Sequence, residues 1–283
     1  MHLVAHYIVI NETHKVMMVL RPYQFFATEA IIHQVKNSND NAYIWHTTGS
    51  GKTLTSFKAS QILMELPEVY KVVFVVDRKD LDYQTMNEFN AFKKDSVDVT
   101  NNTQSLVRQL TDNTKLVLTT IQKLNNAISE RFSGKIEGLR HKKIVFIFDE
   151  CHRSQFGETH DRITKFFEKS QLIGFTGTPI FAENASKNDL GKRTTKDLFG
   201  NCLHKYVITD AIRDQNVLRF GIEYVGKYKN KSNAFIDIEV EDIDKQEVLD
   251  SEKRINKIVD YIIAYHDQKT FNKDYSALLA VSS

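Results

Sequence analysis

Five short apolar segments, each followed directly by polar residues, constrain the fold of this chain more than any other sequence feature. They are Ala42 to Trp45, Val72 to Val76, Leu116 to Leu118, Ile144 to Phe148 and Leu172 to Phe175. Most are rich in β-branched or aromatic residues, and three show no alternation with polar residues. This pattern is typical of strands that are buried on both faces of a parallel sheet.

Residues with helical spacing separate these segments. Between Tyr23 and Val35 the apolar positions repeat every three or four residues, and Pro22 stands near the start, where its missing N–H costs nothing. Similar repeats predict helices around Met86 to Phe92, Ile121 to Ile128 and Ile163 to Phe167. The alternation predicts an α/β fold, a parallel sheet with helices on both faces and right-handed crossovers.

The polar strand ends predict one ligand crevice, because open parallel sheets bind ligands beyond the carboxyl ends of their strands. The chain holds 38 Lys and Arg against 36 Asp and Glu, and 38 − 36 gives a net charge of +2. This balance excludes a histone-like or tail-driven binder of nucleic acid, which carries a large excess of positive charge. A bound anion must therefore be held by local geometry.

Cysteine content and the length of the apolar runs predict a soluble cytoplasmic protein with no membrane partner. Cys151 and Cys202 are too few for a disulfide framework, which favours a reducing compartment. The longest apolar runs have about five residues, against the ~18 needed to cross a bilayer. Residues 1–6 have neither the basic start nor the long apolar stretch of a signal peptide.

A glycine-rich segment with the spacing of a phosphate-binding loop, Thr48-Gly49-Ser50-Gly51-Lys52-Thr53, follows the first predicted strand. Its glycines let the backbone curl round an anion, so that successive N–H groups and the positive end of the next helix face the anion. Lys52 is then expected to reach the outer phosphates of ATP, and the Thr53 hydroxyl to coordinate Mg²⁺. The strict pattern has glycine at the position of His46. The alternative is a glycine-rich turn with an incidental Lys-Thr, but the strand–loop–helix context favours the phosphate site.

Two acidic residues follow the fourth predicted strand. Asp149 suits a residue that helps to hold Mg²⁺, and Glu150 suits the base that orients or deprotonates an attacking water. The alternative is an exposed acidic pair that caps the next helix. Cys151 and His152 do not supply the four ligands of a structural zinc site, so His152 is expected to hydrogen-bond across the crevice.

The turn Thr176-Gly177-Thr178-Pro179 follows the fifth predicted strand. The hydroxyls of Thr176 and Thr178 are expected to contact Glu150 or His152 and to sense the nucleotide state. The alternative is a simple turn, since Gly and Pro commonly interrupt regular structure. The position at a strand end favours a role in the site.

These motifs together resemble the motor part of superfamily-2 helicases and translocases. Longer strings are similar to the R (motor and restriction) subunit of type I restriction–modification enzymes, and the resemblance covers about Val19 to Ser283. The strings are Leu20 to Gln24, Tyr43 to His46, Val75 to Gln84, Thr119 to Leu124, Phe148 to Gln155 and Tyr206 to Ile212.

The resemblance implies ATP-driven translocation of double-stranded DNA before cleavage, two RecA-like motor domains and an assembly with methylation and specificity subunits. It assigns contact with adenine to Arg21 and Gln24. It assigns the phosphates to the glycine-rich segment, and Mg²⁺ and water to Asp149 and Glu150.

Candidates for contact with the DNA backbone come from the second and third strand ends of the same resemblance. They are Arg78, Lys79, Thr120 and Gln122. Phosphate contacts leave little sequence signature. A solvated helix start remains an equal alternative for Arg78 and Lys79.

The domain organisation predicted from this resemblance has three parts. Residues 1–18 form a leader, 19–206 a complete RecA-like motor domain, and 207–283 a linker with the incomplete start of a second RecA-like domain. In the second part of the chain, the apolar repeat from Ile255 to Ile263 predicts an amphipathic helix, and Ser276 to Ser283 predicts a buried strand.

Two activities are expected to be absent or weak. The family's nuclease domain precedes the motor and uses a Glu-x-Lys tripeptide, and no glutamate here is followed two residues later by lysine. The chain is therefore not expected to cut DNA. The arginine finger of the second motor domain is worth about 10³–10⁵ in rate, and without it the chain is expected to bind ATP but to hydrolyse it slowly.

Two other functions stay open. One is another superfamily-2 DNA or RNA helicase, which a strand-separation assay distinguishes from a motor that moves along duplex DNA. The other is a nucleotide-gated docking module without turnover, which steady-state ATPase measurements distinguish from an enzyme.

Overall fold

The computed structural model describes residues 6–76, 87–91, 102–149, 151, 156–183, 185, 187–188, 191–192, 194–221 and 251–280. The chain divides into two compact units, Met1–Phe220 and Gly221–Ser283. The strands are β1 (Ile8–Asn11), β2 (Val16–Val19), β3 (Ala42–His46), β4 (Lys71–Val76), β5 (Leu116–Thr120), β6 (Ile144–Phe148), β7 (Ser170–Thr176), β8 (Lys187–Asn188), β9 (Gly191–Lys192) and β10 (Asn201–Tyr206). The helices are α2 (Pro22–Asn37), α3 (Lys52–Leu63), α5 (Thr103–Thr111), α6 (Ile121–Ala127), α7 (Glu130–Ile136), η1 (Glu137–Leu139), α8 (Phe156–Phe166), α9 (Thr195–Phe199), α10 (Ile208–Arg213) and α12 (Glu252–Lys269).

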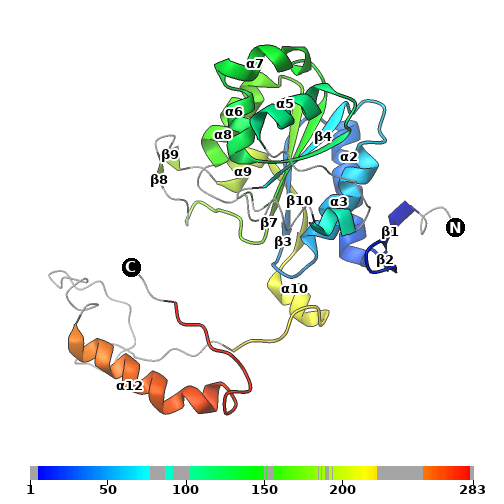
Figure 1. Cartoon of the computed structure of the whole chain (residues 1–283). Coiled ribbons are helices and arrows are strands. Elements are labelled where there is room, and N and C mark those ends of the chain that lie inside the picture. The colour runs from blue at the N-terminus through cyan, green and yellow to red at the C-terminus, as the bar shows by residue number, and fades with distance from the viewer. Residues whose placement is uncertain are drawn as a thin grey trace. The chain divides into compact units, whose positions relative to one another are not determined.

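The first unit is built on a six-stranded sheet with the order β10-β3-β7-β6-β4-β5 (Figure 1). All of its pairings are parallel. The five predicted strands are all present, and each is longer than or equal to its predicted segment. The predicted α/β fold with a parallel sheet is therefore confirmed.

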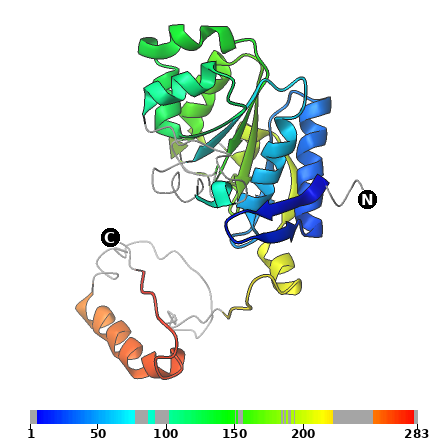
Figure 2. The same ribbon diagram turned by 45° about the vertical axis from the view of Figure 1, so that its right-hand side comes forward.

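Helices cover both faces of the sheet, as Figure 2 shows for α2 and α3 on one side and α5 to α8 on the other. Strand β4 shows why both faces must be covered, because all six of its residues are buried. Val72, Phe74 and Val76 pack into the cluster with α2 and α3, and Val73 and Val75 pack into the opposite cluster. This alternation is the period-two geometry of a strand.

Strand β10 and the antiparallel hairpin β1–β2 were not among the predicted strands. Strand β10 lies at the edge of the sheet beside β3, and five of its six residues are only half-buried or exposed. An edge strand of this kind has no apolar run to mark it. The hairpin starts within the predicted leader, ends at Val19, one residue beyond it, and packs Val9 into the same cluster as α2 and α3.

The second unit contains α12, which confirms the predicted amphipathic helix. The strand predicted at the end of this unit is wrong for residues 276–280, which do not form a strand. Leu278 is 97% exposed and Leu279 is 69% exposed. A strand needs a neighbouring strand to satisfy its backbone, and the described residues of this unit offer none. None of the helices in the described ranges has the length and apolar content to cross a bilayer.

Candidate functional site

The predicted phosphate loop joins the carboxyl end of β3 to the start of α3. The strand ends at His46, and the helix begins at Lys52. Gly49 and Gly51 have φ of +79° and +72°, in the left-handed region that side chains disfavour. Gly51 also serves as the N-cap of α3. The two glycines therefore let the backbone turn so that N–H groups at the helix start face a common point.

Residues of α2 hold this loop from behind. The Tyr23 hydroxyl donates to Ser50 O at 2.8 Å, and Gln24 Nε2 lies 3.3 Å from Ser50 O and 3.2 Å from Gly51 O. A Cβ on Gly51 would lie only 2.7 Å from Gln24 Nε2. Within the loop, Ser50 Oγ donates to Thr47 O at 2.6 Å. The loop shape is thus set by a second segment of the chain as well as by its glycines.

Gln24 and Arg21, the residues predicted to contact adenine, lie at the start of α2. The Gln24 side chain is buried, and its Oε1 accepts a hydrogen bond from Arg21 N at 2.9 Å. Both the oxygen and the nitrogen of the Gln24 amide are therefore hydrogen-bonded to main-chain groups. The Arg21 residue is exposed beside it. Their contact with adenine stays a prediction.

The end of β7 lies directly against the phosphate loop. A Cβ on Gly177 would lie 3.3 Å from Thr48 N and 3.4 Å from His46 O. The indole of Trp45 donates to Gly177 O at 3.2 Å. Thr176 is fully buried, and its Oγ1 accepts a hydrogen bond from the main-chain N–H of Thr178 at 3.1 Å. Thr178 itself is exposed. The first and fifth strand ends therefore lie together.

Asp149 lies at the end of β6, one strand further along the sheet. Its N–H donates to Val75 O at 3.1 Å, and Cys151 N donates to Phe175 O at 3.0 Å. The segment therefore lies between the ends of β4 and β7. Asp149 is half-buried, as are Lys52 and Thr53 at the start of α3. Glu150 and His152 lie outside the described residues.

The oxygen atoms at these positions suit Mg²⁺. A hydroxyl from Thr53 and a carboxylate from Asp149 are hard ligands, and Mg²⁺ usually takes only one or two protein groups together with phosphate and water. Across the described parts of the chain, no group of three or more His, Cys, Asp or Glu residues is placed to bind a metal. A magnesium ion here would therefore depend on the nucleotide for most of its ligands.

The predicted DNA-contacting residues that the structure describes lie at the start of α6. Thr120 is fully buried, and its Oγ1 accepts from Lys123 N at 3.3 Å, which caps the helix. Gln122 is exposed in the first helical turn. Arg78 and Lys79 lie outside the described residues. Contact of these residues with DNA stays a prediction.

Two residues near the loop, His46 and His204, were missed as functional candidates in the sequence. His46 Nε2 lies 2.9 Å from His204 Nδ1, and the two residues are 158 positions apart. Burial, with help from His204 and Lys52, lowers the pKa of His46 to about 3, so the imidazole is neutral at pH 7. The one available signal was the histidine at a position where the strict loop pattern has glycine.

His46 is fully buried, whereas His204 is half-buried, and His46 has one nitrogen without a hydrogen-bond partner in the part of the chain that the structure describes. Its Nδ1 atom is buried and has no partner within the described residues. The rings of Tyr23 and Tyr206 lie edge-on to it at 5.6 and 6.0 Å.

Comparisons with known proteins agree with this geometry. The family profile SWI2/SNF2 ATPase matches residues 23–254. The chain is 50% identical over 283 residues to the type I restriction enzyme SauCOLORF180P endonuclease subunit of Staphylococcus aureus strain COL. This alignment covers 99% of this chain and 30% of the relative. It is 49% identical over 164 residues to a Mycoplasma pneumoniae polypeptide described as a C-terminal part of the type I restriction enzyme MpnIIP endonuclease subunit, which covers 53% of this chain and 80% of that one.

Solved structures show the same RecA-like fold. A nuclease-deletion mutant of the type ISP restriction–modification enzyme LlaGI with a DNA substrate mimic matches with a TM-score of 0.53 and 21% identity, over 70% of this chain and 21% of that one. The type ISP enzyme LlaBIII bound to DNA matches with a TM-score of 0.50 and 19% identity, over 71% and 16%. The chain spans about 30% of the length of the first curated relatives that it matches.

Proposed function

Because the chain belongs to the SWI2/SNF2 ATPase family and to the endonuclease subunits of type I restriction enzymes, we propose that it couples ATP hydrolysis to translocation of double-stranded DNA before cleavage. The observation that carries the proposal is the phosphate loop, with two left-handed glycines between a buried strand and a helix start. This geometry suits the phosphate chain of a nucleoside triphosphate. The near-neutral charge of the chain suits a site that holds phosphate by local geometry.

The proposed roles follow from the sequence motifs and the family resemblance, and for the described residues the geometry of the loop supports them. The N–H groups of the loop from Thr48 to Thr53, together with Lys52, hold the β- and γ-phosphates. Thr53 and Asp149 would hold Mg²⁺, which neutralises phosphate charge when it is bound. Glu150 orients or deprotonates the attacking water. Arg21 and Gln24 contact adenine, as the family resemblance implies.

Coupling and partner contacts complete the proposal. Thr176, Thr178 and His152 sense the nucleotide state, and the end of β7 beside the loop supports this role for the two threonines. Arg78, Lys79, Thr120 and Gln122 contact the DNA backbone. The chain works in the cytoplasm with methylation and specificity subunits and without a membrane partner. The relatives that share the resemblance are named endonuclease subunits of type I restriction enzymes.

The test compares the parent chain with Lys52→Ala and Glu150→Gln. Removal of the Lys52 ammonium is expected to weaken ATP binding by about 10- to 100-fold, because hydrogen bonds to charged groups contribute about 1.5–3 kcal/mol each. Glu150→Gln is expected to keep ATP binding and to lower steady-state hydrolysis, measured with and without duplex DNA in the full-length subunit. Unchanged binding in Lys52→Ala, or unchanged hydrolysis in both variants, contradicts the assignment of the site.

A second measurement tests the DNA contacts. Affinity for duplex DNA is expected to fall with salt, with a slope set by the number of neutralised phosphates. A slope near zero contradicts the proposed backbone contacts. Separation of strands by the intact protein indicates a helicase instead of a duplex motor.

A further inference from the structure

The turn after α10 lies against the phosphate loop. The N–H groups of Asn216 and Val217 both donate to Ala211 O, at 2.8 and 3.2 Å, which folds the turn back over the end of the helix. A Cβ on Gly49 would lie 3.8 Å from Val217 Cγ2, at ordinary van der Waals distance. The first unit ends at Phe220. The loop therefore lies beside the segment through which the chain leaves this unit.

Tyr206 contacts the loop on one side. Its carbonyl accepts a hydrogen bond from Thr47 N at 2.9 Å. Its ring stacks on Tyr23, with centroids 3.6 Å apart and planes 3° from parallel. The Tyr23 hydroxyl in turn donates to Ser50 O. Two of the loop's main-chain groups are thus bonded to this pair of residues, Thr47 N through the Tyr206 carbonyl and Ser50 O through the Tyr23 hydroxyl.

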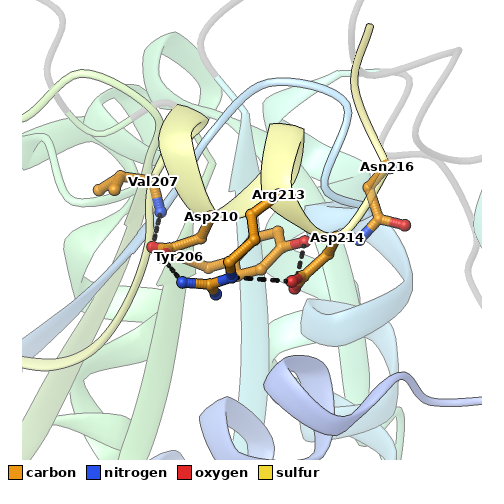
Figure 3. A network of polar contacts seen from close by, with 6 residues as sticks. All are labelled: Tyr206, Val207, Asp210, Arg213, Asp214 and Asn216. Atoms are coloured by element: carbon orange, nitrogen blue, oxygen red, sulfur yellow. Dashed lines mark hydrogen bonds and ion pairs between the residues drawn. The ribbon is translucent and has the colours of Figure 1, made fainter. Parts of the chain in front are cut away.

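The phenol of Tyr206 contacts the turn on the other side. It donates to Asp214 Oδ2 at 3.2 Å and accepts a hydrogen bond from Asn216 Nδ2 (Figure 3). Tyr206 is buried, and burial raises the pKa of its phenol, so the hydroxyl keeps the proton that it donates. The loop and the turn are therefore joined through one side chain.

The other polar contacts of α10 are weaker anchors. Arg213 pairs with Asp210 at 3.1 Å and with Asp214 at 3.2 Å, but its side chain is 70% exposed. Exposed ion pairs contribute little to stability. Val207 N donates to Asp210 Oδ2, but this bond caps the start of α10 and does not reach the loop. The contact of the turn with the loop therefore depends mainly on Tyr206.

We propose that Tyr206 is a positioning residue that holds the phosphate loop in its nucleotide-binding shape and couples it to the turn at Asn216 and Val217. The inference rests on the proposed function, since it takes the phosphate chain of a nucleoside triphosphate as the ligand of the loop. Coupling between two sites is reciprocal. A nucleotide that tightens the loop must therefore also stabilise the turn, and a loosened turn must weaken nucleotide binding.

The experiment measures MgATP affinity by calorimetric titration of the 283-residue chain and of Tyr206→Phe. This substitution keeps the ring stack and the carbonyl but removes both phenol contacts. Affinity is expected to fall about three- to tenfold, as expected for loss of one or two modest hydrogen bonds. Tyr70→Phe is the matched control, because Tyr70 precedes β4 at the opposite end of the sheet, and it is expected to leave the affinity unchanged.

A second readout separates positioning from mere stability. In the parent chain MgATP is expected to slow amide hydrogen exchange in residues 207–217, and in Tyr206→Phe this effect is expected to disappear. If Tyr206→Phe binds MgATP within about twofold of the parent and keeps the effect on 207–217, the inference is overturned. If the variant does not fold, Asn216→Ala removes the donor to the same phenol oxygen, and unchanged affinity in that variant also overturns it.

Lys52→Ala distinguishes this inference from the proposed function. Loss of MgATP binding in Lys52→Ala with normal binding in Tyr206→Phe overturns only the role of Tyr206. Normal binding in Lys52→Ala overturns the phosphate site itself. Weakened binding in both variants, with the exchange effect lost in Tyr206→Phe, supports both.

Discussion

The two ends of the central sheet use lysine in opposite ways. At the amino end, Lys71 is 2% exposed, and its ammonium donates to Asp112 O and Thr114 O. Burial lowers the pKa of this lysine. At the carboxyl end, Lys52 is half-buried and follows a loop in which two glycines adopt the left-handed backbone conformation. Lys71 donates to main-chain carbonyls, whereas Lys52 lies at the start of α3, where we propose that main-chain N–H groups bind phosphate.

The two ends also differ in how far along the chain their contacts come from. Lys71 reaches carbonyls in the connection just before β5, the strand that pairs with its own. The phosphate loop depends on α2, β7 and β10, which come from three separate parts of the chain. The amino end is therefore expected to set stability, and the carboxyl end to respond to a ligand.

The largest effect is expected for Gly51→Ala. The added Cβ meets Gln24 Nε2 at 2.7 Å, and φ of +72° is strained for alanine. We expect ATP affinity to fall at least about tenfold and stability to fall by about 1–3 kcal/mol, measured by calorimetry and thermal unfolding. Gly138→Ala is the control, because a Cβ there meets nothing within 4 Å. An equal loss in both variants would mean that loop geometry is not the cause.

The opposite pattern is expected for Lys71→Met. The variant keeps an apolar stem but removes the two hydrogen bonds that the charged Lys71 ammonium donates to the carbonyls of Asp112 and Thr114, which costs about 1–3 kcal/mol. Urea unfolding should show this loss while ATP affinity stays unchanged. Lys115→Met, at an exposed lysine whose Nζ donates only to Tyr70 O among the described contacts, should change stability by less than about 0.5 kcal/mol. A loss of ATP affinity in Lys71→Met would break the distinction between the two ends.

Acid is expected to lower the stability of the protein through His46, which lies at the carboxyl end of the sheet. The folded pKa of His46 is about 3, below the unfolded value of about 6.5. As the pH falls, the unfolded state therefore takes up a proton at His46 before the folded state does. The free energy of unfolding is thus unaffected by His46 above about pH 6.5 and decreases as the pH falls from about 6.5 toward 3. The loss from this residue between pH 7 and pH 5 is about 2 kcal/mol.

The control for this pH dependence is His46→Gln, whose side chain does not titrate. His204, whose pKa burial also lowers, remains in the variant and leaves a smaller dependence of the same sign. Stability measured from pH 7 to pH 5 should therefore fall less steeply in the variant. Equal slopes in the two proteins would contradict the role of His46.

The sequence predicted strands that are buried at every position, including the edge strand β5, and missed strands whose burial is mixed. Strands β4 and β6 are buried at every position and were found. Strand β10 mixes polar and apolar residues, and five of its six residues are half-buried or exposed. The strand predicted at residues 276–283 had the right composition, but residues 276–280 lack a partner strand in the described second unit. Pairing is a property of the whole sheet, which a local pattern does not contain.

The same limit applied to the site. The glycines, Lys52 and Asp149 could be predicted as site residues because each follows a strand within a few residues. The contacts of His46 with His204 and of Tyr23 with Tyr206 join residues more than 150 positions apart. No spacing rule reaches that far. The hydrogen bonds of Gln24 to the loop likewise require the packed position of α2.

The sheet order has a consequence for synthesis of the protein. Strand β3 lies between β7 and β10, which are made after it, and His204 leaves the ribosome 158 residues after His46. At about 5–20 residues per second, this delay is roughly 8–30 s. Strands β4 and β5 can pair much earlier, because β4 ends at Val76 and β5 at Thr120. The loop after β3 is therefore among the last parts of this unit to gain all of its contacts, because a nascent chain that ends before β10 has the contacts from α2 but lacks those of Tyr206.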